Sequence, residues 1–552
     1  MLGNMMQQPL LIASIIRHAA AQTPSAQIVS RRVEGDIHRY SYAECYRRTC
    51  RLAQALLEFG VKPGDRVATL AWNGYRHIEL YYAISGLGAI VHTVNPRLFA
   101  PQIDYIINHA EDSLLFVDLT FVPLLNELKD RIPTVTRIVL LCAEADAPRD
   151  AAFAFTCYEP LLESRSDAFD WPDFDENTAA CLCYTSGTTG NPKGVLYSHR
   201  STVIHALASC VPNALNLSRS SIVLPVVPMY HVSAWGLPYS GLMAGATLVM
   251  PGAQLDGASL FELIQSEKVN LALGVPTVWL NLLAHLDKIG AKLPQDITIA
   301  VGGAASPLAL VEALREKHGV YLMPLWGMTE TSPLATFGGR TPQVDALPLA
   351  ARDKVQTSAG RPVYGIELEI FDDEDKPLPH DGAQSGQLRV RGPWIMQRYY
   401  CGANAQTDGG ASNEGGADAD ATIDGWFDTG DVATLDTDGY LRIVDRKKDV
   451  VKSGGEWISS IALENAALSH DSVREACVIG VPHRKWDERP LLLVVLEENR
   501  ALDKAAISAH LAERVAKWWL PDDIIAVEEL PHTATGKLHK VPLRERYKHH
   551  YE

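Results

Sequence analysis

The chain has 552 residues, which at about 150 residues per domain predicts roughly three to four folding units. With 66 acidic and 50 basic residues, its net charge of −16 excludes a broad electrostatic grip on nucleic acid or on an anionic membrane. The 47% hydrophobic and 21% charged fractions exclude global disorder, and nine cysteines without a CxxC pair exclude a disulfide-rich scaffold.

The first segment, MLGNMMQQPLLIASIIRHAA, resembles a targeting signal more than any other stretch does. It has no basic region before its apolar run, and that run stops at Arg17. We therefore expect an amphipathic first helix rather than a signal peptide. Because no run approaches the ~18 apolar residues of a membrane span, we expect a cytoplasmic protein with reduced, buried thiols.

Strand-like and helix-like segments alternate over most of the chain, which is typical of parallel α/β layers. The predicted strands span residues 66–71, 90–94, 113–118, 137–142, 221–228, 247–250, 271–276 and 298–304. The predicted helices between them span residues 76–89, 259–269 and 276–286.

The pattern changes near Gly360. Residues 366–372 and 386–392 predict an antiparallel β unit, and residues 401–425, rich in Gly, Ala, Asp and Asn, predict a flexible surface insertion. The last segment predicts a small α+β domain with strands at 476–482 and 490–496 and a helix at 505–519. We place the domain boundary at the charged cluster DRKKD, so that residues 1–445 form one domain and residues 446–552 the other.

A loop rich in Ser, Thr and Gly, YTSGTTGNPKG at residues 184–194, follows the predicted buried strand CLC. Its glycines, Gly187 among them, permit backbone conformations that other residues resist. Exposed amides and hydroxyls can line a phosphate chain, and Lys193 adds a positive charge. A Walker A pattern cannot be placed here. The hydroxyl-bearing residues of the loop are Thr185, Ser186, Thr188 and Thr189.

The same loop strongly resembles the signature loop of the adenylate-forming superfamily, which includes acyl-CoA synthetases, peptide-synthetase adenylation domains and firefly luciferase. Five further motifs extend the resemblance in the family's order: GGAASP, WGMTET, WFDTGD, DRKKDVVKSGGEW and HTATGKLHK. The resemblance implies an α/β fold, with a large N-terminal domain of layered α/β subdomains plus a β unit. It also implies a small, mobile α+β C-terminal domain.

The resemblance implies an enzyme that joins a carboxylic acid to ATP, giving an acyl-adenylate and pyrophosphate, and then transfers the acyl group to a thiol. A carboxylic acid is already ionised at neutral pH, so catalysis needs positioning and cations rather than a general base. By resemblance, Lys537 bridges the carboxylate and the α-phosphate, and Glu330 and Thr185 lie on the Mg²⁺ side. Because no carrier domain is attached, we expect coenzyme A as the thiol.

The nucleotide and the thiol have further contacts that the resemblance implies. Thr329 matches a contact to the α-phosphate, and Asp431 and Arg446 match contacts to the ribose. Lys448 matches the hinge about which the C-terminal domain rotates. The adenine side would be formed by Gly303, Ala304, Ala305, Trp326, Gly327 and Met328, and the thiol tunnel by Lys452, Gly454, Gly455 and Trp457.

The acyl pocket is expected around PMYHVSAWGLPYSGL, together with Gly302. His231 resembles the family's gate between the ATP and acyl sites, and Trp235, four residues later, would share a helical face with it. A bulky indole there argues against a very long alkyl chain.

Within the superfamily, the chain resembles most the branch of 3-methylmercaptopropionate–CoA ligases and medium-chain alkanoate–CoA ligases. We expect 3-methylmercaptopropionate as substrate, with medium-chain fatty acids or a cinnamate-type aromatic acid as alternatives, and a homodimer. A non-catalytic binding protein is the remaining alternative, which Lys537, Glu330 and the complete loop disfavour.

Overall fold

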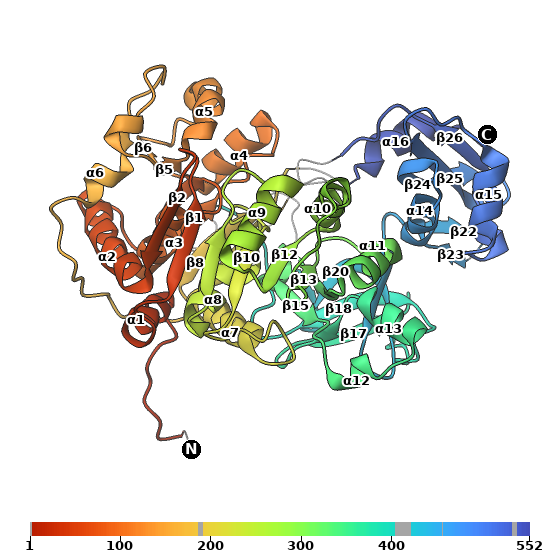
Figure 1. Ribbon diagram of the computed structural model, residues 1–552, viewed down its shortest axis with the longest axis horizontal. Helices are drawn as coiled ribbons and strands as arrows, with labels where there is room; N and C mark the ends of the chain where they lie inside the picture. Colours follow the sequence, from red (N-terminus) through yellow and green to blue (C-terminus); the bar gives the residue numbers. More distant parts are fainter. Residues whose placement is uncertain (1–2, 186–190, 403–420, 455, 533–537, 552) are drawn as a thin grey trace. The chain divides into compact units, whose positions relative to one another are not determined.

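The structure is a computed structural model that describes residues 3–185, 191–402, 421–454, 456–532 and 538–551 (Figure 1). These residues fold into two compact units. The N-terminal unit contains the described residues of 1–185, 191–367 and 391–427, and the C-terminal unit those of 368–390 and 428–552. The boundary predicted between residues 445 and 446 stays a prediction.

One sheet of the N-terminal unit has seven strands, in the order β7-β6-β5-β3-β4-β8-β9. All neighbours are parallel except β8 and β9, which form an antiparallel pair. The chain runs from β3 to β4 on one side and then to β5 on the other, so the strand order reverses beside β3. The strands are β3 (Arg66–Leu70), β4 (Ile90–Thr93), β5 (Leu114–Val117), β6 (Arg137–Leu140), β7 (Thr156–Cys157), β8 (Ala179–Tyr184) and β9 (Gly194–Ser198).

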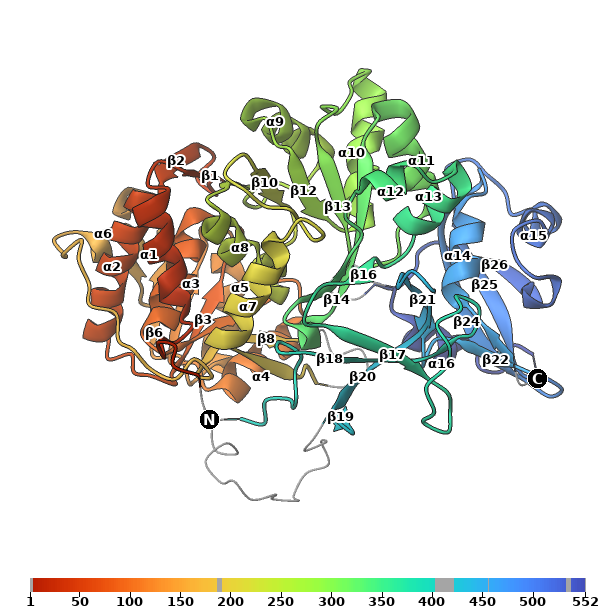
Figure 2. The same ribbon diagram turned by 90° about the horizontal axis from the view of Figure 1, so that it is seen from below.

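Helices α1, α2 and α3 pack against one another beside this sheet (Figure 2). Every residue of α3 is buried, because this helix packs on all sides. The helices of this part are α1 (Ile12–Gln22), α2 (Tyr42–Glu58), α3 (Tyr75–Gly86), α4 (Ala100–Ala110), α5 (Val122–Leu128), α6 (Tyr158–Leu162) and α7 (His199–Cys210).

The second sheet has nine strands, in the order β16-β15-β14-β13-β12-β10-β11-β1-β2. The run from β14 to β1 is parallel, and the strands at both edges are antiparallel to their neighbours. The strands are β1 (Gln27–Arg31), β2 (Ile37–Ser41), β10 (Ile222–Pro225), β11 (Thr247–Met250), β12 (Leu271–Gly274), β13 (Thr298–Val301), β14 (Tyr321–Gly327), β15 (Leu334–Phe337) and β16 (Arg361–Pro362).

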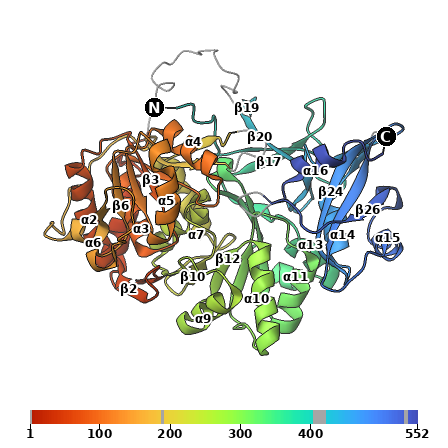
Figure 3. The same cartoon turned by 90° about the horizontal axis from the view of Figure 1, so that it is seen from above.

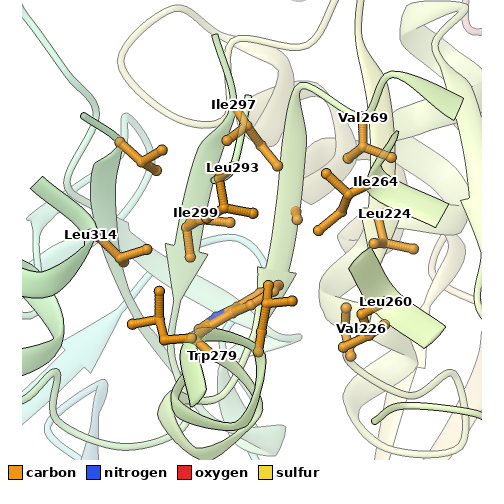
Figure 4. Packing of buried hydrophobic residues seen from close by; sticks show 14 of the residues in the cluster. Leu224, Val226, Leu260, Ile264, Val269, Trp279, Leu293, Ile297, Ile299 and Leu314 are labelled. Atoms are coloured by element: carbon orange, nitrogen blue, oxygen red, sulfur yellow. The ribbon is translucent and has the colours of Figure 1, made fainter. Parts of the chain in front are cut away.

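The core of this second layer lies between the sheet and helices α9 and α10, which lie side by side (Figure 3). Trp279 of α10 belongs to the same buried cluster as Leu224 and Ile299 of the strands, Val226 just after β10, and Leu260 of α9 (Figure 4). The helices are α8 (Leu237–Ala244), α9 (Gly257–Glu267), α10 (Pro276–Ile289), α11 (Leu308–Ala313), α12 (Pro342–Asp345) and α13 (Leu349–Gln356).

A β unit connects to the C-terminal part of the chain. Strand β20 pairs antiparallel with β19 and with β21. Its strands are β17 (Glu367–Phe371), β18 (Gly386–Arg391), β19 (Thr422–Ile423), β20 (Trp426–Leu435) and β21 (Leu441–Arg446).

The last sheet has helices on both faces. Alternate residues of β24 point to opposite sides, so that Val478 packs with α14 and α15 while Ile479 packs with Leu543 of α16. The elements are β22 (Val451–Ser453), β23 (Glu456–Ile458), α14 (Ser460–Leu468), β24 (Val473–His483), β25 (Asp487–Leu496), α15 (Lys504–Ala512), β26 (Asp523–Ala526) and α16 (Lys540–Tyr547).

Two expectations about these elements need correction. The first helix begins at Ile12, so the described residues before it are not helical. Helix α15 ends at Ala512 rather than near Trp519, because Ala516 is extended and Val515 and Trp519 pack onto the sheet instead. At the end of α15, tertiary packing therefore overrides helix propensity.

The predicted insertion at residues 401–425 lies largely outside the described residues. Its last residues are ordered, because β19 turns back onto β20 through Asp424 and Gly425, which have φ values of 49° and 79°. Positive φ at both central residues is typical of a tight hairpin turn and favours the Asp-Gly pair found here. The prediction of a flexible insertion is therefore wrong for residues 422–425.

All nine cysteines are free thiols. Cys181 and Cys183 share one face of β8, with their sulfurs 3.7 Å apart. Seven of these thiols are buried, but Cys210 is only partly buried and Cys401 is exposed, so the expectation of buried thiols is wrong at these two positions. Within the described part of the chain, no helix has the length and apolar character that crossing a membrane requires.

Candidate functional site

The ends of the predicted phosphate loop are held together at the edge of a sheet. Tyr184 ends the buried strand β8, and Gly194 opposite it begins β9. The Thr185 amide donates to the Lys193 carbonyl at 2.9 Å, and the Lys193 amide donates to Oγ1 of Thr185 at 3.2 Å. These two bonds close the loop at its base. Four of its predicted phosphate contacts, Ser186, Gly187, Thr188 and Thr189, lie outside the described residues.

Lys193 and Glu330 lie against the same tyrosine ring. The Lys193 ammonium is 4.6 Å from the ring centroid of Tyr399, and the Tyr399 hydroxyl donates to Oε1 of Glu330 at 2.8 Å. Glu330 is 6% exposed. The structure thus brings a predicted phosphate-binding cation close to the predicted Mg²⁺-side carboxylate, with Tyr399 between them.

Sequence reasoning missed Tyr399. Its partner Glu330 is distant in the chain, so no spacing rule could connect the two residues. Tyr399 also directly precedes Tyr400, whose amide donates to the Gly194 carbonyl at 2.8 Å. The Tyr-Tyr pair before the predicted insertion was the one available signal.

The WGMTET motif leaves strand β14 and enters a short 3-10 turn at Thr329–Thr331. A side chain at Gly327 would place its Cβ 2.0 Å from the Pro333 carbonyl oxygen, so only glycine fits there. The Met328 amide donates to Oγ1 of Thr331 at 2.8 Å, which tightens the turn.

Neighbouring segments hold the backbone carbonyls of this turn. The Tyr197 hydroxyl donates to the Thr329 carbonyl at 2.7 Å, and the Met396 amide donates to the Glu330 carbonyl at 2.8 Å. Trp326, predicted as a wall beside the adenine, is partly buried and lies opposite Thr336 in the sheet.

The predicted adenine-side loop follows β13. Gly303 has φ +79°, a value that favours glycine, and Ala304 and Ala305 are exposed. A Cβ on Gly302 would lie 3.0 Å from Cη2 of Trp235, so these two predicted pocket residues touch.

The segment after His231 differs from the expected helix. Residues Val232, Ser233, Ala234 and Trp235 all have φ between 47° and 55°, and Gly236 follows at 79°. The expectation that Trp235 shares a right-handed helical face with His231 is therefore wrong. Left-handed backbone costs about 1–2 kcal/mol for each residue with a side chain, so the surrounding structure must impose this turn.

Two cysteine thiols of β8 lie beside the left-handed turn. The Ser233 hydroxyl is 3.5 Å from the sulfur of Cys181 and 3.6 Å from that of Cys183. The strand that leads to the phosphate loop therefore also supports the turn that carries Trp235.

In the C-terminal unit, the two predicted ribose residues form an ion pair. Asp431 and Arg446 are opposite each other in the register of β20 and β21, and Nε of Arg446 is 2.8 Å from Oδ1 of Asp431. Asp431 is 2% exposed, and Nη1 of Arg446 also donates to the Thr429 carbonyl at 3.2 Å. The pairing holds both side chains at one edge of the sheet.

The predicted hinge and thiol-tunnel residues come directly after Arg446 in the chain. Burial lowers the pKa of Lys448 from its ordinary value. Lys452 lies opposite Trp457 in the β22–β23 pair, and the Gly454 amide donates to the Trp486 carbonyl at 2.8 Å. Gly455 lies outside the described residues.

The predicted catalytic residue, Lys537, also lies outside the described residues. The chain on either side of it is described. His532 and Leu538 form an antiparallel bridge, and the His539 amide donates to the Pro531 carbonyl at 2.8 Å. Lys540 is then fixed by Glu464, with its Nζ 2.7 Å from Oε1.

Comparison with known proteins agrees with the resemblance found in the sequence. A family model described as AMP-binding enzyme matches residues 16–400, and one described as AMP-binding enzyme C-terminal domain matches residues 462–537. A 3-methylmercaptopropionyl-CoA ligase from Ruegeria lacuscaerulensis is 47% identical over 548 residues, which cover 99% of each chain.

Other relatives carry different names. A medium-chain-fatty-acid–CoA ligase from Ectopseudomonas oleovorans is 46% identical, with 99% of this chain and 98% of that one covered. Among solved structures, an anthranilate CoA ligase in complex with anthranoyl-AMP has a TM-score of 0.81 at 25% identity, with 98% of each chain covered.

Proposed function

The chain belongs to the AMP-binding enzyme family and is an acyl-CoA ligase, and from this premise we propose that its substrate is 3-methylmercaptopropionate, with related short and medium-chain fatty acids. The observation that carries the proposal is the 47% identity to 3-methylmercaptopropionyl-CoA ligases, such as the one from Ruegeria pomeroyi, over 99% of both chains. A medium-chain fatty acid is the second candidate, on the 46% identity to a ligase with that name.

In the first half-reaction, a carboxylate oxygen attacks the α-phosphorus of ATP, and the bond to the pyrophosphate breaks. Two anions must approach each other, so the protein has to supply positive charge and orientation. We assign these tasks to Lys193 at the loop, Thr329 near the α-phosphate and Lys537 at the new bond. A bound Mg²⁺ would screen the phosphate charges.

Glu330 suits Mg²⁺, because a hard carboxylate oxygen is the ligand this ion prefers and because phosphates and water supply most of its other ligands. The hydrogen bond from Tyr399 keeps the carboxylate oriented. Thr185 would add its hydroxyl oxygen.

In the second half-reaction, the sulfur of coenzyme A attacks the acyl carbon, and AMP leaves. We assign Lys448 to the hinge and Lys452, Gly454, Gly455 and Trp457 to the path of the thiol. Asp431 and Arg446 would hold the ribose throughout, because the ion pair fixes their side chains.

The acyl group would end near Trp235, which contacts Gly302. A bulky indole at that point supports a short or medium acid rather than a long chain. An aromatic acid needs a flat pocket, and the same indole could line one, so a cinnamate-type substrate stays the third candidate. We also propose that the enzyme works in the cytoplasm, where free thiols persist, and as a homodimer.

The test is thioester formation by the purified protein with ATP, Mg²⁺ and coenzyme A. The panel contains 3-methylmercaptopropionate, straight-chain acids from acetate to dodecanoate, and cinnamate. We expect the highest kcat/KM for 3-methylmercaptopropionate or an acid of similar length, with one AMP formed per thioester. Preference for dodecanoate or cinnamate would contradict the substrate, and failure to form AMP with any acid would contradict the reaction.

A further inference from the structure

Asn73 reaches from one sheet of the N-terminal unit to the chain that leads into the expected acyl pocket. It is 3% exposed. Its Nδ2 donates to the carbonyls of Pro225 and Val227, each at 2.8 Å, and its Oδ1 accepts from the Met229 amide at 2.6 Å. Both hydrogens of the Asn73 side-chain amide are therefore donated to the same short segment, residues 225–229.

The position of Asn73 explains why one side chain can do this. It comes just after β3 of the seven-stranded sheet, and Pro225 ends β10 of the nine-stranded sheet. The Asn73 backbone is fixed as well, because its carbonyl accepts from the Gly252 amide at 3.1 Å. Asn73 thus joins the carboxyl ends of strands from both sheets, where α/β proteins place their ligands.

Other side chains around Asn73 support the same segment. The Tyr81 hydroxyl donates to the Met229 carbonyl at 2.5 Å. The ring of Trp72 meets that of Tyr230 edge to face, at 5.7 Å between centroids. Helix α3 and the residues just before it therefore hold the backbone up to Tyr230 in place.

The chain beyond Tyr230 enters the left-handed turn. His231 and Trp235 follow Met229 by only a few residues, and residues 232–235 hold positive φ values. A strained turn keeps its shape only when its surroundings over-determine it. The side-chain amide of Asn73 donates two hydrogen bonds to the segment just before the turn and accepts one from it, and these bonds provide that constraint on the entry side of the turn.

We propose that Asn73 is a positioning residue for acyl selectivity, because it fixes the backbone that carries His231 and Trp235. The inference rests on the proposed function, in which these two residues line the acyl pocket. It goes further by assigning part of the selectivity to a residue that does not touch the acid.

The test variant is Asn73→Asp, which keeps the shape of the side chain. An oxygen then replaces Nδ2 and faces two carbonyl oxygens, so both donated bonds become repulsions. We expect KM for the preferred acid to rise about tenfold and the preference among chain lengths to flatten. KM for ATP should change by less than about twofold, since the nucleotide contacts lie on other segments.

Asn270 provides a matched control at the opposite end of β10. Its Nδ2 donates to the Ser220 carbonyl at 2.9 Å, and its Oδ1 accepts from the Ile222 amide at 2.8 Å. Asn270→Asp makes the same chemical change far from the left-handed turn. It should lower Tm without altering the order of preference among the acids.

A milder variant covers the case in which Asn73→Asp does not fold. Tyr81→Phe removes one hydrogen bond from Met229 without adding charge, and it should shift the acid preference in the same direction by a smaller factor. Unchanged preference in a folded Asn73→Asp or in Tyr81→Phe would overturn the inference, as would an equal shift in Asn270→Asp. If the wild type activates no acid at all, the proposed function fails instead.

Discussion

The Tyr399 hydroxyl donates a hydrogen bond to Oε1 of Glu330 at 2.8 Å, and this bond joins a residue before the predicted insertion to the WGMTET turn. The same ring faces the Lys193 ammonium at 4.6 Å. Tyr399 therefore orients the carboxylate that we assign to Mg²⁺ and positions the loop cation.

Tyr399→Phe should raise KM for Mg²⁺–ATP by about three- to tenfold, because Glu330 loses a donor that orients it. The effect should stay below that of removing Glu330, since phenylalanine keeps the ring beneath Lys193. Steady-state kinetics with varied Mg²⁺–ATP would measure it. Tyr400→Phe is the control, because the Tyr400 hydroxyl has no hydrogen-bond partner within the described residues. Equal effects from both variants would contradict the assignment.

We assign Lys537 to the bridge between the carboxylate and the α-phosphate, so Lys537→Ala should lower acid-dependent pyrophosphate release by about a thousandfold. ATP binding should stay close to that of the wild type. Lys376→Ala removes an exposed lysine that pairs only with Glu374 in the described structure, and it should have no effect. Pyrophosphate release near the wild-type rate in Lys537→Ala would refute the catalytic role.

Lys448→Ala and Lys452→Ala should impair thioester formation more than adenylation. The hinge and the thiol path are needed only after the adenylate has formed. Single-turnover assays that supply preformed acyl-adenylate would isolate the second half, and pyrophosphate release would report the first. Losses of the same size in both halves would contradict the hinge assignment.

The contact between Gly302 and Trp235 offers a test of acyl length. Trp235→Ala should move the preference toward longer or bulkier acids by removing the indole. Gly302→Ala places a methyl group 3.0 Å from Cη2 of the indole and 3.2 Å from the Leu325 carbonyl oxygen, so it should push Trp235 and weaken binding of the preferred acid. Competition between pairs of acids, read as the ratio of thioester products, would measure both. An unaltered ratio in both variants would remove Trp235 from the acyl pocket.

Asp118 predicts a pH dependence of stability. Burial raises its pKa from 3.8 to about 7, although it accepts a hydrogen bond from the Trp72 amide at 2.7 Å. A carboxyl group with a raised pKa favours the folded state below its unfolded pKa, and this contribution is lost as the pH rises through the folded pKa. The full difference amounts to about 4 kcal/mol.

Asp118→Asn should therefore raise Tm at about pH 8 and raise it less, or lower it, at about pH 5. Asparagine can still accept the bond from Trp72, so the fold is kept. Thermal denaturation at the two pH values would measure the difference. A Tm change of the same size at both would show that Asp118 is ionised in the folded state throughout.

Much of the fold could be predicted from local sequence. The apolar run at residues 247–250 is β11 without any change of boundary, because a strand buried on both faces of a parallel sheet reads as a continuous hydrophobic run. The loop at residues 184–194 was found from composition alone. In both cases the sequence pattern that supports the prediction lies within a few consecutive residues.

The failures are those in which distant parts of the chain decide the outcome. Trp235 lies in a segment with helical spacing, yet contacts with β8 and Asn73 impose a left-handed turn. Tyr399 and Asn73 act on partners far away in sequence, and no periodicity reports such pairs. The Asp424–Gly425 turn, by contrast, was readable from its two residues and was missed.

The last sheet of the chain carries apolar clusters on both of its faces, each covered by its own helices. The apolar side chains of this domain are therefore shielded from water by the domain's own helices. A change in the orientation of this domain would not expose its core to water. Only the backbone that connects it to the rest of the chain would have to change conformation. If this domain rotates about Lys448 as we propose, the rotation would not have to expose apolar surface to water.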